Sequence, residues 1–209
     1  MRRNPLQKRA KDSVDAIIEA GFISLAKHGL TNTTTVHISD IAGISPGTLY
    51  QYFDNKEAVY AAMQRHFVND ILATLDDIVP ELVQMDIRNA VMFLLHRLTD
   101  TLMSNGGRYL KYAQQTLHAF DENLSNGAHE IERKLQGIII QYVMHHPKLM
   151  KVKSIPTLNY LVINGGILII IRYLSDSKPA ISLEQLIEGF GNMAVRYIDG
   201  EINNEMEHN

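Results

Sequence analysis

Residues 33–60, TTTVHISDIAGISPGTLYQYFDNKEAVY, constrain the fold more than any other stretch of the chain. Ile38, Ile41 and Ala42 follow the i, i+3, i+4 spacing of a helix with one buried face. Gly43 comes directly after them, and glycine takes the left-handed conformation that ends a helix without steric cost. The pattern therefore predicts a short helix that stops at residue 43.

A second short helix is expected to begin after two more residues. Ser45 is a favourable N-cap, and Pro46 falls at the first helical position, where its missing N–H is not needed. Leu49 and Phe53 are four residues apart and face inward together. The other face has no charge, and its residues are Gly47, Thr48, Tyr50, Gln51 and Tyr52. The spacing predicts a helix-turn-helix whose second helix, from Pro46 to Phe53, could enter the major groove of DNA.

An amphipathic helix precedes this motif and a long helix follows it. From about Lys8 to His28 one helical face is apolar, and Gly29 is expected to stop this helix. Asp54 and Glu57 form a variant capping box for the next helix. Its apolar pattern continues to Val79, where Pro80 is expected to end it, which predicts a helix about 36 Å long.

Beyond residue 80 the apolar positions keep a helical period, without the alternation of a strand. Further helices are expected over residues 86–104, 108–120, 124–146, 156–174 and 182–197. The sequence thus predicts an all-α protein with about nine helices in total. Residues 1–55 would form a three-helix helix-turn-helix domain with a basic N-terminal arm, and residues 56–209 a second helical domain.

Composition argues against several classes of protein. The chain has no cysteine, which rules out disulfides and thiolate metal sites and fits a cytoplasmic location. The longest nearly uncharged apolar run, residues 158–171, is shorter than the roughly 20 residues of a membrane span. The basic N-terminus is not followed by the apolar segment of a secretory signal. We therefore expect a soluble protein.

The charges are distributed unevenly along the chain. The net charge of −3 would not suggest a nucleic-acid binder. However, residues 1–56 carry seven Lys or Arg and five Asp or Glu, a net charge of +2, and the rest of the chain has a net charge of −5. The positive charge therefore lies on the domain with the helix-turn-helix, where contacts with phosphates would need it.

No motif for catalysis or metal binding stands out. The nine histidines include no HxxxH or HExxH pair. The sequence also has no GxSxG, P-loop or GxGxxG motif. No catalytic residue, metal site or cofactor is therefore expected.

The helices between residues 85 and 146 combine apolar bulk with a few polar groups, as small-molecule sites do. The same pattern also describes an ordinary core. The candidates for a ligand pocket are Met92, Phe93, His96, Met103, Tyr112, His118, Phe120, Tyr142 and Met144.

The run from Leu161 to Ile171 is apolar nearly all round, which indicates burial on more than one side. Its glycine pair, Gly165 and Gly166, costs about 1 kcal/mol per glycine relative to alanine, so a close approach of another helix has to explain it. A second buried face suggests a homodimer. A central core helix of a monomer is the alternative.

The ordered string of residues in the motif also carries a family resemblance. It comprises Thr33-Thr34-Thr35, Ile38, the turn 42–45, the helix 47–53 and Asn55-Lys56-Glu57. This string is similar to the DNA-binding domain of TetR/AcrR-family transcriptional repressors, over roughly residues 10–62. Two positions depart from the usual pattern: Ser39 stands where the family usually has alanine, and Ile41 where a polar residue is frequent.

The resemblance implies a dimeric DNA-binding repressor without enzymatic activity, released from a palindromic operator by a small molecule bound in the C-terminal domain. Its partners would be double-stranded DNA, the effector and a second copy of the chain. Thr48 and Gln51 are the expected base readers. Phosphates would be held by Thr35, Tyr50, Tyr52 and Lys56, and the DNA-binding set is completed by Thr34, Ser45, Pro46 and Gly47.

The resemblance further implies that the last two helices of each subunit form a four-helix dimer interface. The expected interface residues are Ile163, Gly166, Ile167, Ile170, Leu186, Phe190, Met193 and Tyr197. Two other classes of protein are the alternatives: a helical small-molecule carrier or enzyme without DNA binding, and an adaptor that binds a protein through the helix-turn-helix. The first would have no reason to keep an uncharged face rich in hydroxyl groups, and the second would show little salt-dependent affinity for DNA.

Overall fold

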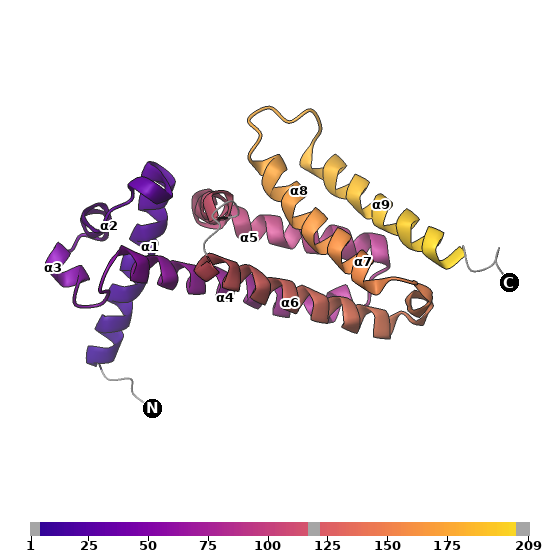
Figure 1. Cartoon of the computed structure of the whole chain (residues 1–209), viewed down its shortest axis with the longest axis horizontal. Coiled ribbons are helices and arrows are strands. Elements are labelled where there is room, and N and C mark those ends of the chain that lie inside the picture. Colours follow the sequence, from indigo (N-terminus) through magenta and orange to yellow (C-terminus); the bar gives the residue numbers. More distant parts are fainter. Residues whose placement is uncertain (1–4, 117–121, 204–209) are drawn as a thin grey trace. The chain divides into compact units, whose positions relative to one another are not determined.

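The computed structural model describes residues 5–116 and 122–203 (Figure 1). These residues form helices α1 to α9 and two short helical segments, η1 and η2, with no strand among them, so the all-α prediction is confirmed. The chain divides into two compact units: residues 1–69 with 103–128 (unit 1), and residues 70–102 with 129–209 (unit 2). This division differs from the expected boundary at residue 55, because a segment from the middle of the chain belongs to unit 1.

Unit 1 contains α1 (Pro5–Asn32), α2 (Thr35–Ala42), α3 (Pro46–Leu49), the first part of α4 (Lys56–Leu82) and the last part of α5 (Ile87–Thr116). The apolar face of α1 packs with Ile38, Leu49 and Phe53 in the core of this unit. Gly29 interrupts α1 at φ 80° and ψ 165°, a conformation that favours glycine. The core also includes Tyr109 and Tyr112 from α5.

Several boundaries differ from those expected. Pro80 does not end α4, which continues to Leu82; the Val83 N–H still donates to Val79 O at 3.1 Å, so the last turn closes around the exposed proline. Asn55, not Asp54, caps α4, because its Oδ1 accepts from the Ala58 N–H at 2.8 Å. Helix α3 ends at Leu49, and tighter turns continue to residue 53.

Helix α5 is sharply kinked where the chain passes from unit 2 to unit 1. Ser104 leaves the helical conformation, and Asn105, Gly106 and Gly107 follow at φ 53°, 70° and 74°. Three successive left-handed residues would be costly for most side chains, which explains the two glycines. The expected stop of the first α5 segment at 105–107 is therefore confirmed.

Unit 2 contains the other parts of α4 and α5 and most of α6 (Glu122–His145). These are followed by η1 (Pro147–Lys151), α7 (Ile155–Asn159), η2 (Tyr160–Asn164), α8 (Gly165–Leu174) and α9 (Leu183–Asn203). Segment η2 has the wider π-type turn and joins α7 to α8 without a break. In Figure 1, α8 and α9 lie side by side and are joined by a loop at one end.

The close helix approach predicted at the glycine pair is present inside the subunit. A Cβ on Gly166 would lie 3.2 Å from Leu95 Cδ2 on α5 and 3.5 Å from Phe190 Cε1 on α9. The glycine therefore lets α8 pack against two helices of its own chain.

The run Ile155–Leu174 is long and apolar enough to cross a membrane, with 20 residues and a mean hydropathy of 1.5 over its most apolar window. Of that window, 28% is buried. A core helix of a soluble protein meets the same two criteria, so the run does not by itself indicate a membrane protein.

Candidate nucleic-acid interface

The turn between α2 and α3 has the geometry that the sequence predicts. Gly43 is left-handed at φ 68° and ψ 29°, and the Ile44 N–H donates to Ser39 O at 3.0 Å. Ser45 Oγ then caps α3 by accepting from the Thr48 N–H at 3.0 Å. These local bonds hold α2 and α3 as a helix-turn-helix.

The three successive threonines have three different roles. Thr33 is buried, and its hydroxyl donates to Gly29 O at 2.9 Å. Thr34 is the N-cap of α2 and accepts from the His37 N–H at 3.2 Å. Thr35 begins α2, and its Oγ1 lies 3.1 Å from Tyr50 Oη. Only Thr34 and Thr35 therefore keep hydroxyl groups near the surface.

The outer side of α3 and the following turn forms a surface without charge, which we call the recognition face. It consists of Pro46, Gly47, Thr48, Tyr50, Gln51 and Tyr52, all exposed except Thr48, which is half-buried. Leu49 and Phe53 face the other way and are buried in the core of unit 1. The hydroxyl contacts of Thr35 with Tyr50 and of Ser45 with Thr48 join four of the predicted DNA-binding residues in this one region.

Lys56 stands apart from that hydroxyl network. It is the first residue of α4, and its Nζ lies 5.6 Å from the centre of the Tyr60 ring, within the range of a cation–π contact. A cation at a helix N-terminus opposes the helix dipole. Tyr60 offsets part of that cost and orients the ammonium group.

Both departures from the usual family pattern are accommodated inside α2. Ser39 is fully buried, but its hydroxyl donates to Thr35 O at 2.7 Å, so no polar group is left without a partner. Ile41 is half-buried and packs against the core of unit 1.

A set of residues that holds the corner between α1 and α2 was not identified from the sequence. The Leu30 N–H donates to Gln115 Oε1 at 2.5 Å, and Gln115 Nε2 donates to Leu25 O at 3.4 Å. Tyr60 Oη donates to Leu30 O at 2.7 Å. Partial burial raises the pKa of Tyr60, so its hydroxyl stays a donor at neutral pH. No local signal could reveal these bonds, because Gln115 is 85 residues from Leu30.

An aromatic cluster joins the last part of α5 to α1 and α4 within unit 1. The Phe22 ring lies 5.2 Å from that of Tyr109 and 5.4 Å from that of Tyr112, in edge-on geometry. Tyr109 Oη lies 2.9 Å from His66 Nδ1, and Arg108 pairs with Glu19 at 2.5 Å. Burial raises the pKa of Tyr112 well above its ordinary value.

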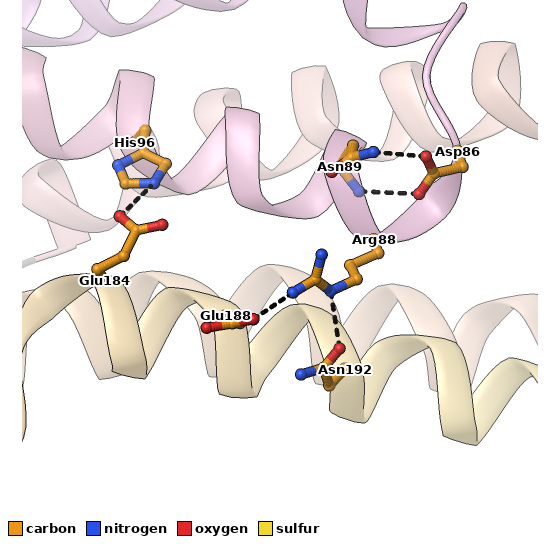
Figure 2. A network of polar contacts seen from close by, with 7 residues as sticks. All are labelled: Asp86, Arg88, Asn89, His96, Glu184, Glu188 and Asn192. Carbon is orange, nitrogen blue, oxygen red and sulfur yellow. Dashed lines mark hydrogen bonds and ion pairs between the residues drawn. The ribbon is translucent and has the colours of Figure 1, made fainter.

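The candidate ligand residues are spread over both units. Tyr112 is buried in unit 1, while Met103 is exposed there. In unit 2, His96 Nε2 pairs with Glu184 Oε2 at 3.2 Å (Figure 2) and Tyr142 Oη donates to Met85 O at 2.8 Å. Burial and the nearby charge of Asp86 raise the pKa of Tyr142 to about 12. Met92 and Phe93 are half-buried and Met144 is exposed, while His118 and Phe120 lie outside the residues whose side chains are described.

A cavity of about 40 Å³ lies elsewhere in unit 2, where α5, α6 and the η2–α8 run meet. None of the described ligand candidates lines it. Its lining is Leu94, Leu95, Leu98, Leu135, Ile138, Ile139, Val162, Ile163 and Ile167.

The expected dimer residues fall into two groups. Ile163, Gly166, Ile170 and Phe190 are buried inside unit 2, so their side chains are not available to a second copy, and for these four we correct the expectation. The reason is that α8 and α9 use this face to pack on each other and on α5. Met193 is exposed, and Ile167, Leu186 and Tyr197 are half-buried.

Polar contacts on α5 fix α9 along its exposed edge. Arg88 of α5 donates to Glu188 Oε1 at 2.5 Å and to Asn192 Oδ1 at 2.8 Å (Figure 2). Asp86 caps α5 by accepting from the Asn89 N–H at 3.1 Å. Within the described part of the chain, no group of three His, Asp or Glu side chains is placed to hold a metal ion.

This geometry defines an all-helical protein with an N-terminal helix-turn-helix of the DNA-binding type. Residues 17–63 match the model of the bacterial regulatory proteins of the tetR family. The N-terminal segment of the chain therefore carries a regulatory domain of the tetR type, and this match covers residues 17–63.

Individual relatives agree with this assignment. The transcriptional repressor KstR2 of Rhodococcus jostii is 41% identical over 63 residues, which span 30% of this chain and 31% of KstR2, or about a third of that protein. The fatty acid degradation regulator FadR from Bacillus halodurans has a TM-score of 0.71 at 16% identity, covering 93% of this chain and 96% of FadR. The regulator FadR from Bacillus subtilis, solved with stearoyl-CoA, has a TM-score of 0.70 at 15% identity, covering 87% and 97%. At such identities the two structures show the shared fold alone.

Proposed function

We propose that the protein is a cytoplasmic transcriptional repressor that binds a palindromic operator as a homodimer and leaves it when a small molecule binds unit 2. The observation that carries the proposal is the recognition face, an exposed and uncharged surface on a TetR-type helix-turn-helix. A carrier or enzyme would have no use for such a face.

The recognition face divides into base readers and phosphate contacts. Gln51 is exposed, and its amide can form two hydrogen bonds with the edge of an adenine. Thr48 is the second base reader. The hydroxyls of Thr35, Tyr50 and Tyr52 and the ammonium of Lys56 bind phosphates, which set the register of the protein on the duplex. Thr34 and Ser45 cap their helices and thereby hold α2 and α3 against the DNA.

Dimerisation places two recognition faces on the same side of the operator. The exposed apolar side chains Leu161, Leu168 and Met193 support an interface made by the outer sides of η2, α8 and α9. Two-fold symmetry requires inverted half-sites, about 34 Å or a multiple apart along the DNA.

The effector acts through the difference between its affinities for the two conformations of the repressor. The stearoyl-CoA complex of the Bacillus subtilis FadR supports a small-molecule effector for this fold. A coupling free energy of about 1–3 kcal/mol would weaken operator binding roughly 5- to 150-fold.

The test is the selection of bound fragments from random duplex DNA with the purified protein at physiological salt. We expect enrichment of an inverted repeat. A second selection with protein that has been unfolded, freed of small molecules and refolded removes any bound effector. Failure of both preparations to enrich an inverted repeat would overturn the proposal.

A further inference from the structure

The cavity in unit 2 has an unusually uniform lining. All nine of its lining residues are leucine, isoleucine or valine, with no aromatic ring, hydroxyl or charged group. Such walls offer neither stacking partners nor hydrogen bonds. A ligand that enters gains free energy only by removing apolar surface from water, at about 0.8 kcal/mol per buried methylene.

We propose that this cavity binds the linear alkyl chain of the effector, a fatty acid or its acyl thioester. This inference rests on the proposed function, because it names the chemical class of the ligand that unit 2 would sense. A flexible chain can follow the gaps between leucine and isoleucine side chains. A rigid aromatic or polyhydroxylated molecule would leave its polar groups without partners.

The size of the cavity couples binding to a change in structure. A volume of about 40 Å³ has room for about three water-sized groups. A chain of eight or more carbons therefore has to move α5, α6 and η2–α8 apart. Such a ligand prefers an expanded conformation over the one described here, which is the condition for a small molecule to shift an equilibrium.

One wall of the cavity contains an irregular helical turn. Val162 and Ile163 lie in η2, whose π-type turn is a backbone form often found at functional sites. Asn159 lies one turn earlier on the same helical face, and its Oδ1 is buried without a hydrogen-bond partner. Asn159 is itself half-buried, but a buried acceptor atom without a partner requires an explanation. The carbonyl or carboxyl end of an acyl chain supplies a partner, since the amide can also donate after rotation.

Calorimetric titration without DNA tests the ligand class. The probes are octanoic, dodecanoic and hexadecanoic acids and their CoA thioesters, with naphthoic acid as the rigid aromatic comparison. We expect affinity to rise about tenfold for every two added methylenes until the chain fills the expanded cavity. The inference fails if neither series binds, or if naphthoic acid binds as tightly as the longest chain. Comparison of acids with thioesters identifies the source of the chain.

Two adjacent isoleucines of α6 provide a matched pair of variants. Ile139 lines the cavity, whereas Ile140 is exposed to solvent. Ile139→Phe fills the cavity and should weaken dodecanoic acid binding at least tenfold, while Ile140→Phe should leave it unchanged. Equal effects of the two substitutions would overturn the site.

Two further substitutions, Leu98→Ala and Asn159→Ala, distinguish an effect on ligand binding from a loss of folding. Leu98→Ala removes side-chain volume from the wall, so it should tighten the binding of hexadecanoic acid although it lowers the melting temperature. Asn159→Ala should weaken every chain length by about the same factor of 3 to 10. Weaker binding by Leu98→Ala in a folded protein would contradict the inference.

The inference and the proposed function can fail separately. Chain-length-dependent binding by a protein that selects no DNA repeat would leave the alkyl site standing and overturn the repressor. Selection of an inverted repeat by a protein that binds no alkyl chain would support the repressor and overturn the alkyl site.

Discussion

Gln115 makes contacts with α1 that only the folded structure reveals. It accepts a hydrogen bond from the Leu30 N–H and donates one to Leu25 O. Leu30 directly follows Gly29, where the α1 backbone leaves the helical conformation. Gln115 therefore supplies an acceptor for a backbone N–H at this interruption.

We expect Gln115→Ala to lower the free energy of unfolding by about 1–3 kcal/mol, because it leaves a partly buried N–H without an acceptor. Urea denaturation measures this change, and hydrogen exchange at the Leu30 amide locates it. Gln115→Glu is the control: its carboxylate can still accept from Leu30, so the amide of Leu30 should remain protected. Equal loss of protection in both variants would show that the acceptor is not what matters.

Lys56 and Gln51 should affect DNA binding in different ways. Lys56→Ala removes a phosphate contact, so it should reduce the salt dependence of operator affinity by about one unit in log–log slope, for every sequence alike. Gln51→Ala should leave that slope unchanged and relax the base preference at one operator position, at a cost of about 1–3 kcal/mol. Binding isotherms at several salt concentrations on the selected and the substituted operator distinguish the two. An unchanged slope for Lys56→Ala would remove it from the phosphate contacts.

At the scale of elements, the turn between α2 and α3 depends on the left-handed Gly43. No atom lies within 4 Å of a Cβ added to this glycine, so the effect of Gly43→Ala comes from the backbone alone. We expect a loss of about 1 kcal/mol of stability. Gly137→Ala, inside α6 and equally free of neighbours, should instead add about 0.5–1 kcal/mol. Thermal denaturation of both variants checks the opposite signs, and equal signs would contradict the argument.

The elements also show what a sequence can and cannot predict. The stop at Gly43, the cap at Ser45 and the break at Asn105-Gly106-Gly107 were predictable because one residue's conformational preference determines each. The sequence assigns the N-cap of α4 to Asp54, whereas the structure has Asn55 in that role. Both residue types are good N-caps, and only their positions in the turn decide between them. Pro80 was expected to end α4, but the chain tolerates it close to the helix end, where few bonds are lost.

The candidate site was predictable in part for the same reason. The residues of the recognition face are neighbours in the sequence, and their helical spacing separates them from the buried Leu49 and Phe53. Periodicity marks Tyr112 as apolar and inward-facing, but it does not say which core the side chain enters. Tyr112 packs with Phe22 in unit 1, and the cavity lies among plain leucines and isoleucines that no pattern distinguishes from core.

At the scale of the whole molecule, the dimer can be tested with two equally exposed residues. Leu168 on α8 is 53% exposed and Ile140 on α6 is 54% exposed. We expect Leu168→Lys to give monomers, because it places a charge in an apolar interface, and to abolish tight binding to the full operator. Ile140→Lys should remain dimeric. Sedimentation velocity decides, and a dimeric Leu168→Lys would place the interface elsewhere.

Tyr109 and Tyr112 belong to the core that also contains the helix-turn-helix, although they follow it by more than 50 residues. The family match ends at residue 63, well before them. A chimera that exchanges only the first 63 residues with another regulator would therefore separate Phe22 from its aromatic neighbours and Leu30 from Gln115. Transplanting the DNA specificity of this protein requires residues 103–116 to travel with the N-terminal segment, as one discontinuous module.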